Sequence, residues 1–329
     1  MSKILYFINY LFAILLLVGY ALPYISPEYA ASISVLSLTV PVLIVVNTLF
    51  VLYWGITLNK KILLSLVCLT IGYFASTPLY IFSKNKNTAS DTFTIMNYNV
   101  KLYNLYDWID DKEIPEKIRA FVKAENPDIL CVQEHNNTSK ITYPYKYINL
   151  RSGNHPLGQA IYSKYKIINQ GSIDFKGTYN NAIFVDIVKN LDTIRIYNIH
   201  LQSLNLEISK ENLGQKSSEK LFSLLSYKFT KQQRQVDKIM AHKNKCPYPV
   251  VLSGDFNNTA YSWAYHQLKL AMTDSFIESG SGFGKTLSFK RIPMRIDFIF
   301  ADKTFIFTEH TNYNIKYSDH TPIMATIGI

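Results

Sequence analysis

Cysteine is scarce in this chain: three cysteines in 329 residues give no disulfide framework. Cysteine and histidine also do not cluster with the spacing of a zinc site. The glycine-rich stretch at Gly280, Gly282 and Gly284 lacks the strand and helix that frame a dinucleotide-binding loop. A disulfide scaffold, a cysteine-histidine zinc site and a dinucleotide motif at these glycines are therefore excluded.

Acidic residues are nearly absent from the start of the chain. Residues 1–86 contain Glu28 as their single acid, beside five lysines. After residue 86 the excess of basic over acidic residues is modest. Such a balance suits an anionic substrate or an acidic membrane surface but does not require nucleic acid. No repeated basic residues interleaved with aromatics mark a nucleic-acid track.

Long apolar runs dominate the same N-terminal region. They extend over Ile4–Leu22, Ala31–Trp54 and Ile62–Phe82, and none contains a charged residue. Each run is about as long as the 20 residues that cross a bilayer core, so we predict three transmembrane helices. A cleaved signal peptide would explain the first run but not the next two.

The lysines near these runs predict an orientation. With three spans, Lys3 falls on the same side as Lys60 and Lys61, whereas the first loop carries only Glu28. The positive-inside rule then places the N-terminus in the cytoplasm and the chain after the third span outside it. We expect an integral protein of a bacterial inner membrane, with an anchor at 1–83, a polar linker at 84–91 and an extracytoplasmic domain at 92–329.

A short apolar strand at Val250–Ser253 ends in Gly254 and is followed by Asp255 and Asn257. If the chain stays extended, the two polar side chains point to the same side. They could then bind a metal ion, an attacking water or a phosphate oxygen together. The alternative is an ordinary turn cap, since Asp and Asn are common turn residues.

Polar residues also stand at or near the ends of other predicted strands. These residues are Asn99, Glu134, His200, Asp297, and Asp319 with His320. Helical spacing of apolar residues additionally predicts a helix over Ile114–Glu125, stopped by Pro127. Each polar residue alone has a structural interpretation, but their joint occurrence at successive strand ends indicates a site.

With these motifs the chain resembles the endonuclease/exonuclease/phosphatase family, as a membrane-anchored member of bacterial type. The matching motifs occur in the family's order over residues 92–329: Asn97-Tyr98-Asn99, Val132-Gln133-Glu134, Asn198-Ile199-His200-Leu201, Gly254-Asp255-Phe256-Asn257, Arg295-Ile296-Asp297-Phe298-Ile299 and Ser318-Asp319-His320. The resemblance implies a four-layer α/β sandwich, in which two mixed sheets pack face to face between helices. It also implies hydrolysis of a phosphoester.

The resemblance further implies a divalent metal, Mg²⁺ or else Mn²⁺ or Ca²⁺. Glu134 is implied as the main ligand, helped by Asn99, and Asp297 is implied to support a histidine or to line the site. The residues themselves agree, because hard oxygen ligands suit Mg²⁺ better than Zn²⁺.

The remaining roles implied by the resemblance are catalytic. Asp255 would orient or deprotonate the attacking water, and Asn257 would hold a phosphate oxygen. His320, paired with Asp319, would contact the phosphate and share acid-base work with His200. The resemblance leaves open which group is the general base. Histidines titrate near neutrality, so both suit this work.

Two functions remain open from the sequence. One is a membrane-anchored, metal-dependent phosphoesterase with the bilayer as partner and no obligate protein partner evident. Its substrate would be either a phospholipid or sphingolipid headgroup or a nucleic acid. The tether and the apolar stretch Phe222–Phe229, within the insertion at 203–231, favour a lipid headgroup. The other is a catalytically inactive membrane scaffold.

Overall fold

The computed structural model describes residues 2–82, 87–138, 140–151, 157–204, 215–289 and 292–329. The chain divides into two compact units. Unit 1 consists of Met1–Leu79, Ser203–Arg234 and Asn258–Gln267, and unit 2 of Tyr80–Gln202, Gln235–Asn257 and Leu268–Ile329. The predicted linker at 84–91 lies partly outside the described residues.

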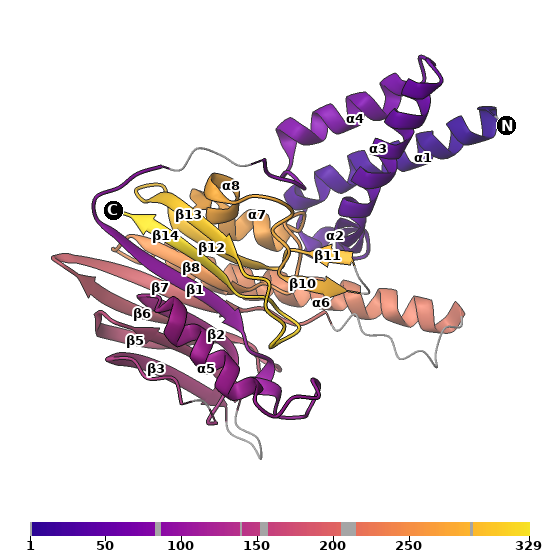
Figure 1. Ribbon diagram of the computed structural model, residues 1–329. Helices are drawn as coiled ribbons and strands as arrows, with labels where there is room; N and C mark the ends of the chain where they lie inside the picture. The colour runs from indigo at the N-terminus through magenta and orange to yellow at the C-terminus, as the bar shows by residue number, and fades with distance from the viewer. Residues whose placement is uncertain (1, 83–86, 139, 152–156, 205–214, 290–291) are drawn as a thin grey trace. The chain divides into compact units, whose positions relative to one another are not determined.

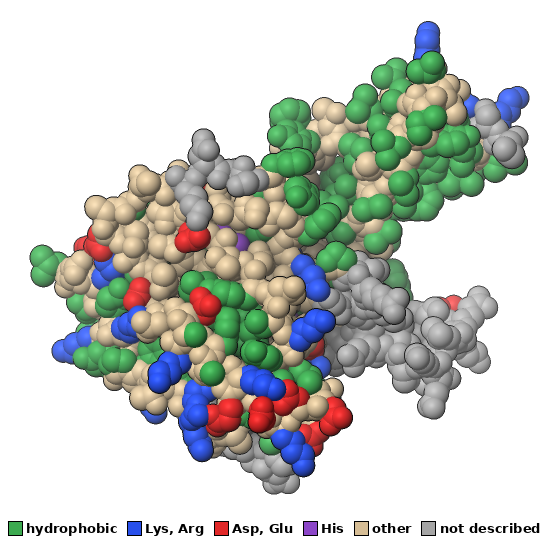
Figure 2. Space-filling model, in the orientation of Figure 1, with side chains coloured by type: hydrophobic (Ala, Val, Ile, Leu, Met, Phe, Trp, Pro, Cys, Tyr) green, Lys and Arg blue, Asp and Glu red, His purple; other side chains and the backbone are tan. Residues whose placement is uncertain are grey.

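Apolar helices form most of unit 1 (Figure 1). They are α1 (Ser2–Ala21), η1 (Leu22–Tyr24), α2 (Pro27–Ser34), η2 (Val35–Thr39), α3 (Val40–Ile56) and α4 (Ile62–Ala75). Side chains such as Phe7, Leu49 and Phe74 are exposed on them, and Figure 2 shows apolar side chains covering this helical part. An apolar surface this continuous is unfavourable in water and fits a lipid environment.

The prediction of three spans is wrong. Two helical segments, Lys3–Tyr24 and Pro27–Ile56, have the length and composition to cross a membrane. The third apolar run forms only the 14-residue α4, about 21 Å long, against a bilayer core of about 30 Å. Pro78 explains the early end, because a proline disfavours helical backbone at the preceding residue and Ser76 is already extended.

A chain of buried polar groups joins α1, α3 and α4 inside unit 1. Asn9 Nδ2 donates to Ser65 Oγ over 2.6 Å, and Ser65 Oγ donates to Asn47 Oδ1 over 2.8 Å. Trp54 Nε1 donates to Asn9 Oδ1 over 3.0 Å. Because unsatisfied polar groups are costly among apolar helices, this network fixes how the three helices align.

Unit 2 is built on two six-stranded mixed sheets (Figure 1). The first has the order β13-β14-β1-β2-β4-β3 and the second β5-β6-β7-β8-β12-β9. The first sheet contains β1 (Thr92–Asn99), β2 (Ile129–Asn136), β3 (Tyr145–Arg151), β4 (Leu157–Ser163), β13 (Ile306–Asn312) and β14 (Ile323–Gly328). The second contains β5 (Lys166–Asp174), β6 (Asn181–Lys189), β7 (Asp192–His200), β8 (Val250–Asp255), β9 (Met272–Asp274) and β12 (Asp297–Asp302). A short hairpin of β10 (Leu287–Phe289) and β11 (Ile292–Met294) completes the described strands.

Each sheet has one parallel pair near its centre, β1 with β2 and β7 with β8. Successive side chains of a strand point to opposite faces, so Phe93 and Ile95 join the core between the sheets while Met96 and Tyr98 face outward. The outward residues pack against Ile118 and its neighbours on α5 (Ile114–Glu125).

The outer face of the second sheet is covered by the C-terminal part of α6 (Gln215–Lys243). There His242 Nδ1 lies 2.7 Å from the hydroxyl of Tyr197 on β7. These layers confirm the predicted α/β sandwich of two packed mixed sheets flanked by helices. The remaining helices are α7 (Trp263–Lys269), α8 (Ser275–Ser279) and η3 (Lys101–Asn104).

The predicted helix Ile114–Glu125 is confirmed with the same bounds as α5. The insertion predicted at 203–231 lies partly outside the described residues, and its later part belongs to the long helix α6. The glycine-rich loop contains Gly282, which forms an isolated bridge with Ile81.

Candidate active site

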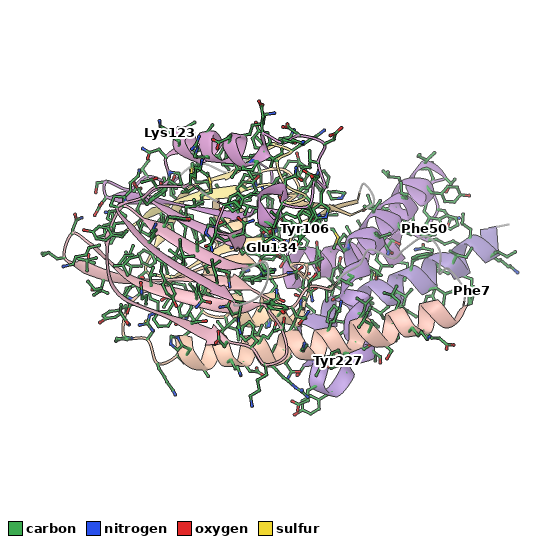
Figure 3. All side chains as sticks on the ribbon, turned by 90° about the horizontal axis from the view of Figure 1, so that it is seen from below. Phe7, Phe50, Tyr106, Lys123, Glu134 and Tyr227 are labelled. Atoms are coloured by element: carbon green, nitrogen blue, oxygen red, sulfur yellow. The ribbon has the colours of Figure 1, made fainter. Side chains whose placement is uncertain are left out.

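The candidate active site lies where both parallel pairs end. Strand register places Asn99 beside Gln133 in the first sheet and His200 beside Asp255 in the second. Asp297, at the start of β12, is the antiparallel partner of Asp255. Figure 3 labels Glu134 at this end of the strands, away from Lys123 on α5. The ends of parallel strands therefore gather most of the predicted residues.

A buried network of amides links the two sheets beneath the site. Gln133 Nε2 donates to Asn97 Oδ1 over 2.8 Å and to Asn198 Oδ1 over 2.5 Å. Ser253 Oγ also donates to Asn97 Oδ1, over 3.0 Å. The sequence analysis did not assign these four residues to the site. The alternation of side chains along a strand could have identified two of them. Asn97 and Asn198 stand two residues before Asn99 and His200, so each lies on the same strand face as its site residue.

His320 is held by Asp297 rather than by Asp319. His320 Nδ1 donates to Asp297 Oδ2 over 2.8 Å, and Asn97 Nδ2 donates to the other oxygen of Asp297 over 3.2 Å. Asp319 instead forms an ion pair of 2.6 Å with Lys101 Nζ. The predicted pairing of His320 with Asp319 is not found among the described hydrogen bonds and ion pairs: Asp319 contacts Lys101, and the pairing of β12 with β8 brings Asp297 to His320. The contact between Asp297 and His320 is the one expected if Asp297 supports a histidine, and that role stays a prediction.

Asp255 lies between two imidazoles. Its Oδ2 is 3.8 Å from His200 Nε2 and 3.7 Å from His320 Nε2, and it accepts a hydrogen bond of 3.0 Å from Asn99 Nδ2. Burial raises the pKa of Asp255, and the nearby Asp297 raises it further, against the opposing effect of the two histidines. A carboxyl group shifted in this direction is suited to accept a proton near neutral pH.

The two histidines differ in charge. Burial disfavours the charged form of His320, but the carboxylates of Asp297 and Asp255 outweigh it and raise its pKa to about 10. For His200 burial dominates, and its pKa is lowered despite Asp255. At neutral pH the site therefore presents a cationic imidazole at His320 and a neutral imidazole at His200. Of the two, His320 is the one suited to bind an anion.

The turn after β8 brings Asn257 back onto Asp255. Gly254 is required there because a Cβ atom would lie 2.0 Å from the carbonyl oxygen of Ile199. Asn257 has a φ of 51°, and its backbone N–H donates to Asp255 Oδ1 over 2.7 Å. Its Nδ2 donates to Leu201 O over 3.0 Å. The chain is not extended here, so Asp255 both caps this turn and faces the site.

Glu134 is placed by a break in its strand. The register of β2 shifts between Gln133 and His135, and Glu134 has a φ of 50°, which L-residues rarely adopt. Burial raises the pKa of its carboxyl, and the hydrogen bond from Asn99 Nδ2 lowers it. That bond, 3.2 Å long, is the single hydrogen bond to the Glu134 carboxylate among the described residues.

This environment fits a divalent cation. A half-buried carboxylate with one amide donor gains most from a positive charge beside it, and Glu and Asn offer the oxygen ligands that Mg²⁺ favours. Ligand atoms of Asp255, Asp297 and His320 also lie within 4.8 Å of one another. In that group, however, Asp297 and His320 are already hydrogen-bonded to each other. Glu134 is therefore the better candidate ligand. Asn99 lies beside it, although its Oδ1 also accepts a hydrogen bond of 3.1 Å from Lys101 N.

A left-handed turn follows β1 at the edge of the site. Residues Lys101, Leu102, Tyr103 and Asn104 have φ values of 43°, 54°, 55° and 64°. Each such residue costs about 1–2 kcal/mol, so the surrounding structure must hold the turn. Asn136 Nδ2 donates to Leu102 O over 2.7 Å, and the Tyr103 hydroxyl lies 2.8 Å from His135 Nδ1. The turn positions Lys101 beside Asp319.

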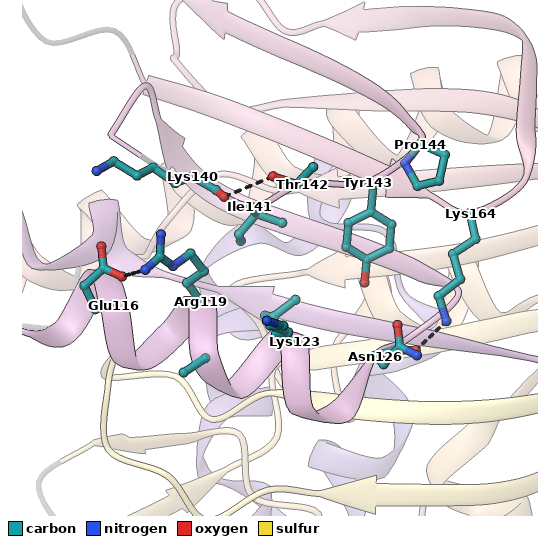
Figure 4. Close-up of a pocket in the computed structure, with 12 residues that line it drawn as sticks. Glu116, Arg119, Lys123, Asn126, Lys140, Ile141, Thr142, Tyr143, Pro144 and Lys164 are labelled. Atoms are coloured by element: carbon teal, nitrogen blue, oxygen red, sulfur yellow. Dashed lines mark hydrogen bonds and ion pairs between the residues drawn. The ribbon is translucent and has the colours of Figure 1, made fainter.

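Two cavities near α5 and the site differ in their relation to these residues. One of about 940 Å³ lies between α5 and the segment Lys140–Pro144, and Figure 4 shows its basic lining. There Lys164 Nζ donates to Asn126 O over 2.7 Å. None of its lining residues belongs to the candidate site. A second cavity of about 490 Å³ is lined by Lys101, Ser318 and Asp319 and directly adjoins the site.

Comparison with protein families gives two matches. The model of the Endonuclease/Exonuclease/phosphatase family matches residues 96–320. A model described as a domain of unknown function matches residues 2–79. A search of curated protein sequences finds no match. The first match contains every residue of the candidate site.

Solved structures share the fold of unit 2 at low sequence identity. An endonuclease/exonuclease/phosphatase from Beutenbergia cavernae is 16% identical, with a TM-score of 0.56, and 72% of each chain is covered. The human Nocturnin catalytic domain with bound sulfate is 16% identical with a TM-score of 0.56, covering 73% of this chain and 95% of that one. D. rerio TDP2 complexed with single strand DNA product is 15% identical with a TM-score of 0.54, covering 73% of this chain and all of that one.

Proposed function

Because this chain belongs to the endonuclease/exonuclease/phosphatase family, we propose that it is a divalent-metal-dependent phosphodiesterase tethered to a membrane. One observation carries the proposal: buried Asp255 lies within 4 Å of two histidines, His200 and His320, that differ in charge. A scaffold has no need for such an arrangement, since buried carboxylates and imidazoles that stabilise nothing are costly.

Glu134 and Asn99 would hold the metal ion. When bound, a divalent ion supplies positive charge to the non-bridging phosphate oxygens and counters the repulsion between the diester and an oxygen nucleophile. The burial of Glu134 and its single amide donor support this assignment. The oxygen ligands of Glu134 and Asn99 suit Mg²⁺, Mn²⁺ or Ca²⁺ better than Zn²⁺.

The remaining side chains supply acid-base chemistry and orientation. Asp255, whose pKa is raised by burial, would take the proton of the attacking water. The water oxygen bonds to phosphorus, the bond to the leaving oxygen breaks, and that oxygen departs as an alcohol after taking up a proton. His320, kept cationic by Asp297, would bind a phosphate oxygen and stabilise the charge that develops there.

His200 and Asn257 complete the proposed machinery. His200 is neutral, so it can either accept or donate a hydrogen bond to the water or the phosphate. Asn257 is fixed by its bonds to Asp255 and Leu201, which support an orienting role next to a phosphate oxygen. Asp319 would act through Lys101, its ion-pair partner, rather than on His320.

The membrane tether is supported by the two long apolar helical segments at the N-terminus. We propose that they hold the catalytic unit close to a bilayer. The predicted extracytoplasmic side depended on three spans. With two spans, Lys3 before the first and Lys60 and Lys61 after the second favour a cytoplasmic N-terminus and a catalytic unit on the same, cytoplasmic side of a bacterial inner membrane. A reporter fused after Ile329 tests this orientation, and an extracytoplasmic signal from it would overturn the charge argument.

The decisive experiment compares metal-dependent hydrolysis in matched variants. Full-length protein in detergent is assayed on bis-p-nitrophenyl phosphate with Mg²⁺, Mn²⁺, Ca²⁺ or EDTA. We expect turnover with Mg²⁺, abolished by EDTA, and a loss of about 100-fold or more in Asp255→Asn. Asp174→Asn makes the same chemical change at an exposed carboxylate of β5 and should stay active.

Phospholipid vesicles and single-stranded DNA are assayed in parallel, because headgroup diesters and nucleic acid are the two candidate substrates. If the wild type and Asp255→Asn are equally inactive on all three substrates with every metal, the scaffold function replaces the enzyme.

A further inference from the structure

We propose that the cavity beside Asp319 is a subsite for a nucleotide unit adjoining the scissile phosphodiester, with its base on Trp108 and its flanking phosphate on Lys285 and Lys316. This inference rests on the proposed phosphodiesterase function and names the substrate class. The cavity, of about 490 Å³, is lined by residues of the left-handed turn, by Lys285 and by the segment 314–321.

The cavity adjoins the catalytic centre. Asp319 lines it and directly precedes His320. Ser318, also in its lining, donates through Oγ to the carbonyl oxygen of Asn99 over 2.9 Å. A substrate whose phosphate contacts His320 would therefore have its neighbouring group next to this cavity.

The cavity attracts anions. Three lysines line it, Lys101, Lys285 and Lys316, against one acid, Asp319. Asp319 is already paired with Lys101 at 2.6 Å. In the part of the chain that the structure describes, Lys285 and Lys316 are exposed and form no ion pair, so their charges are available to a ligand. An excess of two positive charges suits a phosphate next to the one being hydrolysed.

Trp108 gives the cavity a flat aromatic wall. Its side chain is 46% exposed although tryptophan is usually buried. Lys101 Nζ lies 5.0 Å from the centre of its ring, and the ring of Tyr106 lies 5.1 Å away in an edge-on arrangement. An exposed indole beside lysines is the combination on which nucleic-acid bases stack.

Hydrogen bonds of the Asn104 side chain hold the segment around Trp108 in place. Asn104, the last residue of the left-handed turn, donates through Nδ2 to Ile109 O over 2.7 Å and accepts from Ile109 N over 2.9 Å. The same Nδ2 donates to Asp111 O over 3.2 Å. A strained turn is thus tied to the residue after Trp108. Such strain at the edge of a site is expected where a rigid, preformed surface receives a ligand.

These features favour a nucleotide over a lipid headgroup. A planar ring and a second phosphate occur together in nucleotides, whereas the common phospholipid headgroups have no planar ring to stack on Trp108. The same unit could come from a nucleic-acid strand or from a small dinucleotide, and the two sources are compared in the test.

The test pairs two diesters that share a leaving group. The first, the thymidine diester, is thymidine 3′-phosphate 5′-(p-nitrophenyl phosphate), which carries a nucleoside and a second phosphate; methyl p-nitrophenyl phosphate carries neither. Full-length Trp108→Ala and the double variant Lys285→Ala/Lys316→Ala should lose about 10-fold to 100-fold in kcat/KM on the thymidine diester. Both should keep wild-type rates on the methyl diester, and Trp108→Phe should recover most of the loss.

Matched controls remove the same groups elsewhere. Tyr179→Ala deletes an exposed aromatic ring, and Lys245→Ala/Lys303→Ala deletes two exposed lysine charges outside the cavity. Neither should change the ratio of the two kcat/KM values. Single-stranded DNA and thymidylyl-thymidine, assayed in parallel, distinguish a strand from a dinucleotide, and loss with Trp108→Ala on either supports the subsite.

Failure of the inference is distinguishable from failure of the proposed function. If wild type cleaves the methyl diester but the Trp108 and lysine variants affect both diesters equally or neither, the subsite is overturned and the phosphodiesterase stands. If wild type cleaves no diester, the proposed function fails, and calorimetric binding of the methylphosphonate analogue of thymidylyl-thymidine decides about the subsite. Binding weakened about 10-fold by Trp108→Ala supports it, and no binding by wild type overturns it.

Discussion

Two histidines in unit 2, His320 buried and His310 half-buried, carry opposite pKa shifts. His320 donates to the carboxylate of Asp297 at 2.8 Å, and its pKa is raised to about 10. His310, on β13, lies 2.8 Å from Ser275 Oγ through Nδ1 and 3.2 Å from Asn312 Oδ1 through Nε2. Burial lowers its pKa to about 4.

The difference shows what separates a structural cluster from a catalytic one. Ser275, His310 and Asn312 contain the residue types of a nucleophilic triad, yet the serine is fully buried and out of reach of a substrate. Burial therefore keeps His310 neutral. At His320 the carboxylates of Asp297 and Asp255 outweigh burial and keep the imidazole charged, which suits a site that binds an anion.

The largest effect is expected from removing the carboxylate that distinguishes the two histidines. Asp297→Asn keeps the shape of the side chain but removes its charge, so His320 loses the main carboxylate that keeps its imidazole protonated. We expect kcat on bis-p-nitrophenyl phosphate to fall about 10²-fold to 10⁴-fold. A steady-state assay measures this, with circular dichroism to confirm the fold. A loss of less than about threefold would remove Asp297 from the mechanism.

A smaller effect is expected on stability at His310, and its sign follows from the shift. The pKa of His310 is about 4 in the folded protein and about 6.5 in the unfolded chain. Between these values the unfolded chain binds the additional proton, so stability falls as pH drops from about 6.5 to about 4. The total is on the order of 3 kcal/mol. The facing groups Asp274 and Arg295 oppose each other and are paired at 2.6 Å.

His310→Gln removes this titration and should flatten the loss of stability at low pH. Urea unfolding of the full chain at pH 7, 5.5 and 4.5, compared with wild type, measures the difference in slope. Equal slopes in both proteins would mean that His310 titrates normally. Activity at pH 7 should be retained, since His310 does not reach the site.

The smallest effect is expected at Ser275. Ser275→Ala removes the hydroxyl that bonds His310 Nδ1 and leaves a buried polar atom without this partner. We expect a loss of about 1–3 kcal/mol in unfolding free energy and no change in kcat. Chemical denaturation tests the expected loss of stability, and the diesterase assay tests the expectation that kcat does not change. A large fall in kcat with an intact fold would make the Ser275 cluster part of a catalytic site after all.

The sequence predicts the inner strands of both sheets but not the outer ones. The central strands, such as β1 and β8, are apolar and bounded by turns, so they stand out. The strands β3, β5, β9 and β13, none of which was predicted, occupy the four sheet edges. Edge strands such as β5 are largely exposed and carry mixed polar residues, so their pattern does not differ from that of a loop.

Site residues could be predicted from the sequence where they stand at strand ends. Their contact partners could not be predicted where tertiary structure determines which residues meet. Asn99, Glu134, His200 and Asp255 were identified from position alone, and the structure brings them together. The partner of His320 could not be inferred from proximity in sequence, since Asp297 reaches it only through the pairing of β12 with β8. Gln133 was missed because its role is to join the two sheets.

Substituting the two histidines in the same way tests the central claim most directly. His320→Gln and His310→Gln are measured side by side for Mg²⁺-dependent hydrolysis of bis-p-nitrophenyl phosphate at pH 7. We predict that His320→Gln loses at least about 100-fold in kcat with its fold intact, while His310→Gln keeps wild-type kcat. Equal activity of both variants, or loss only in His310→Gln, would contradict the account.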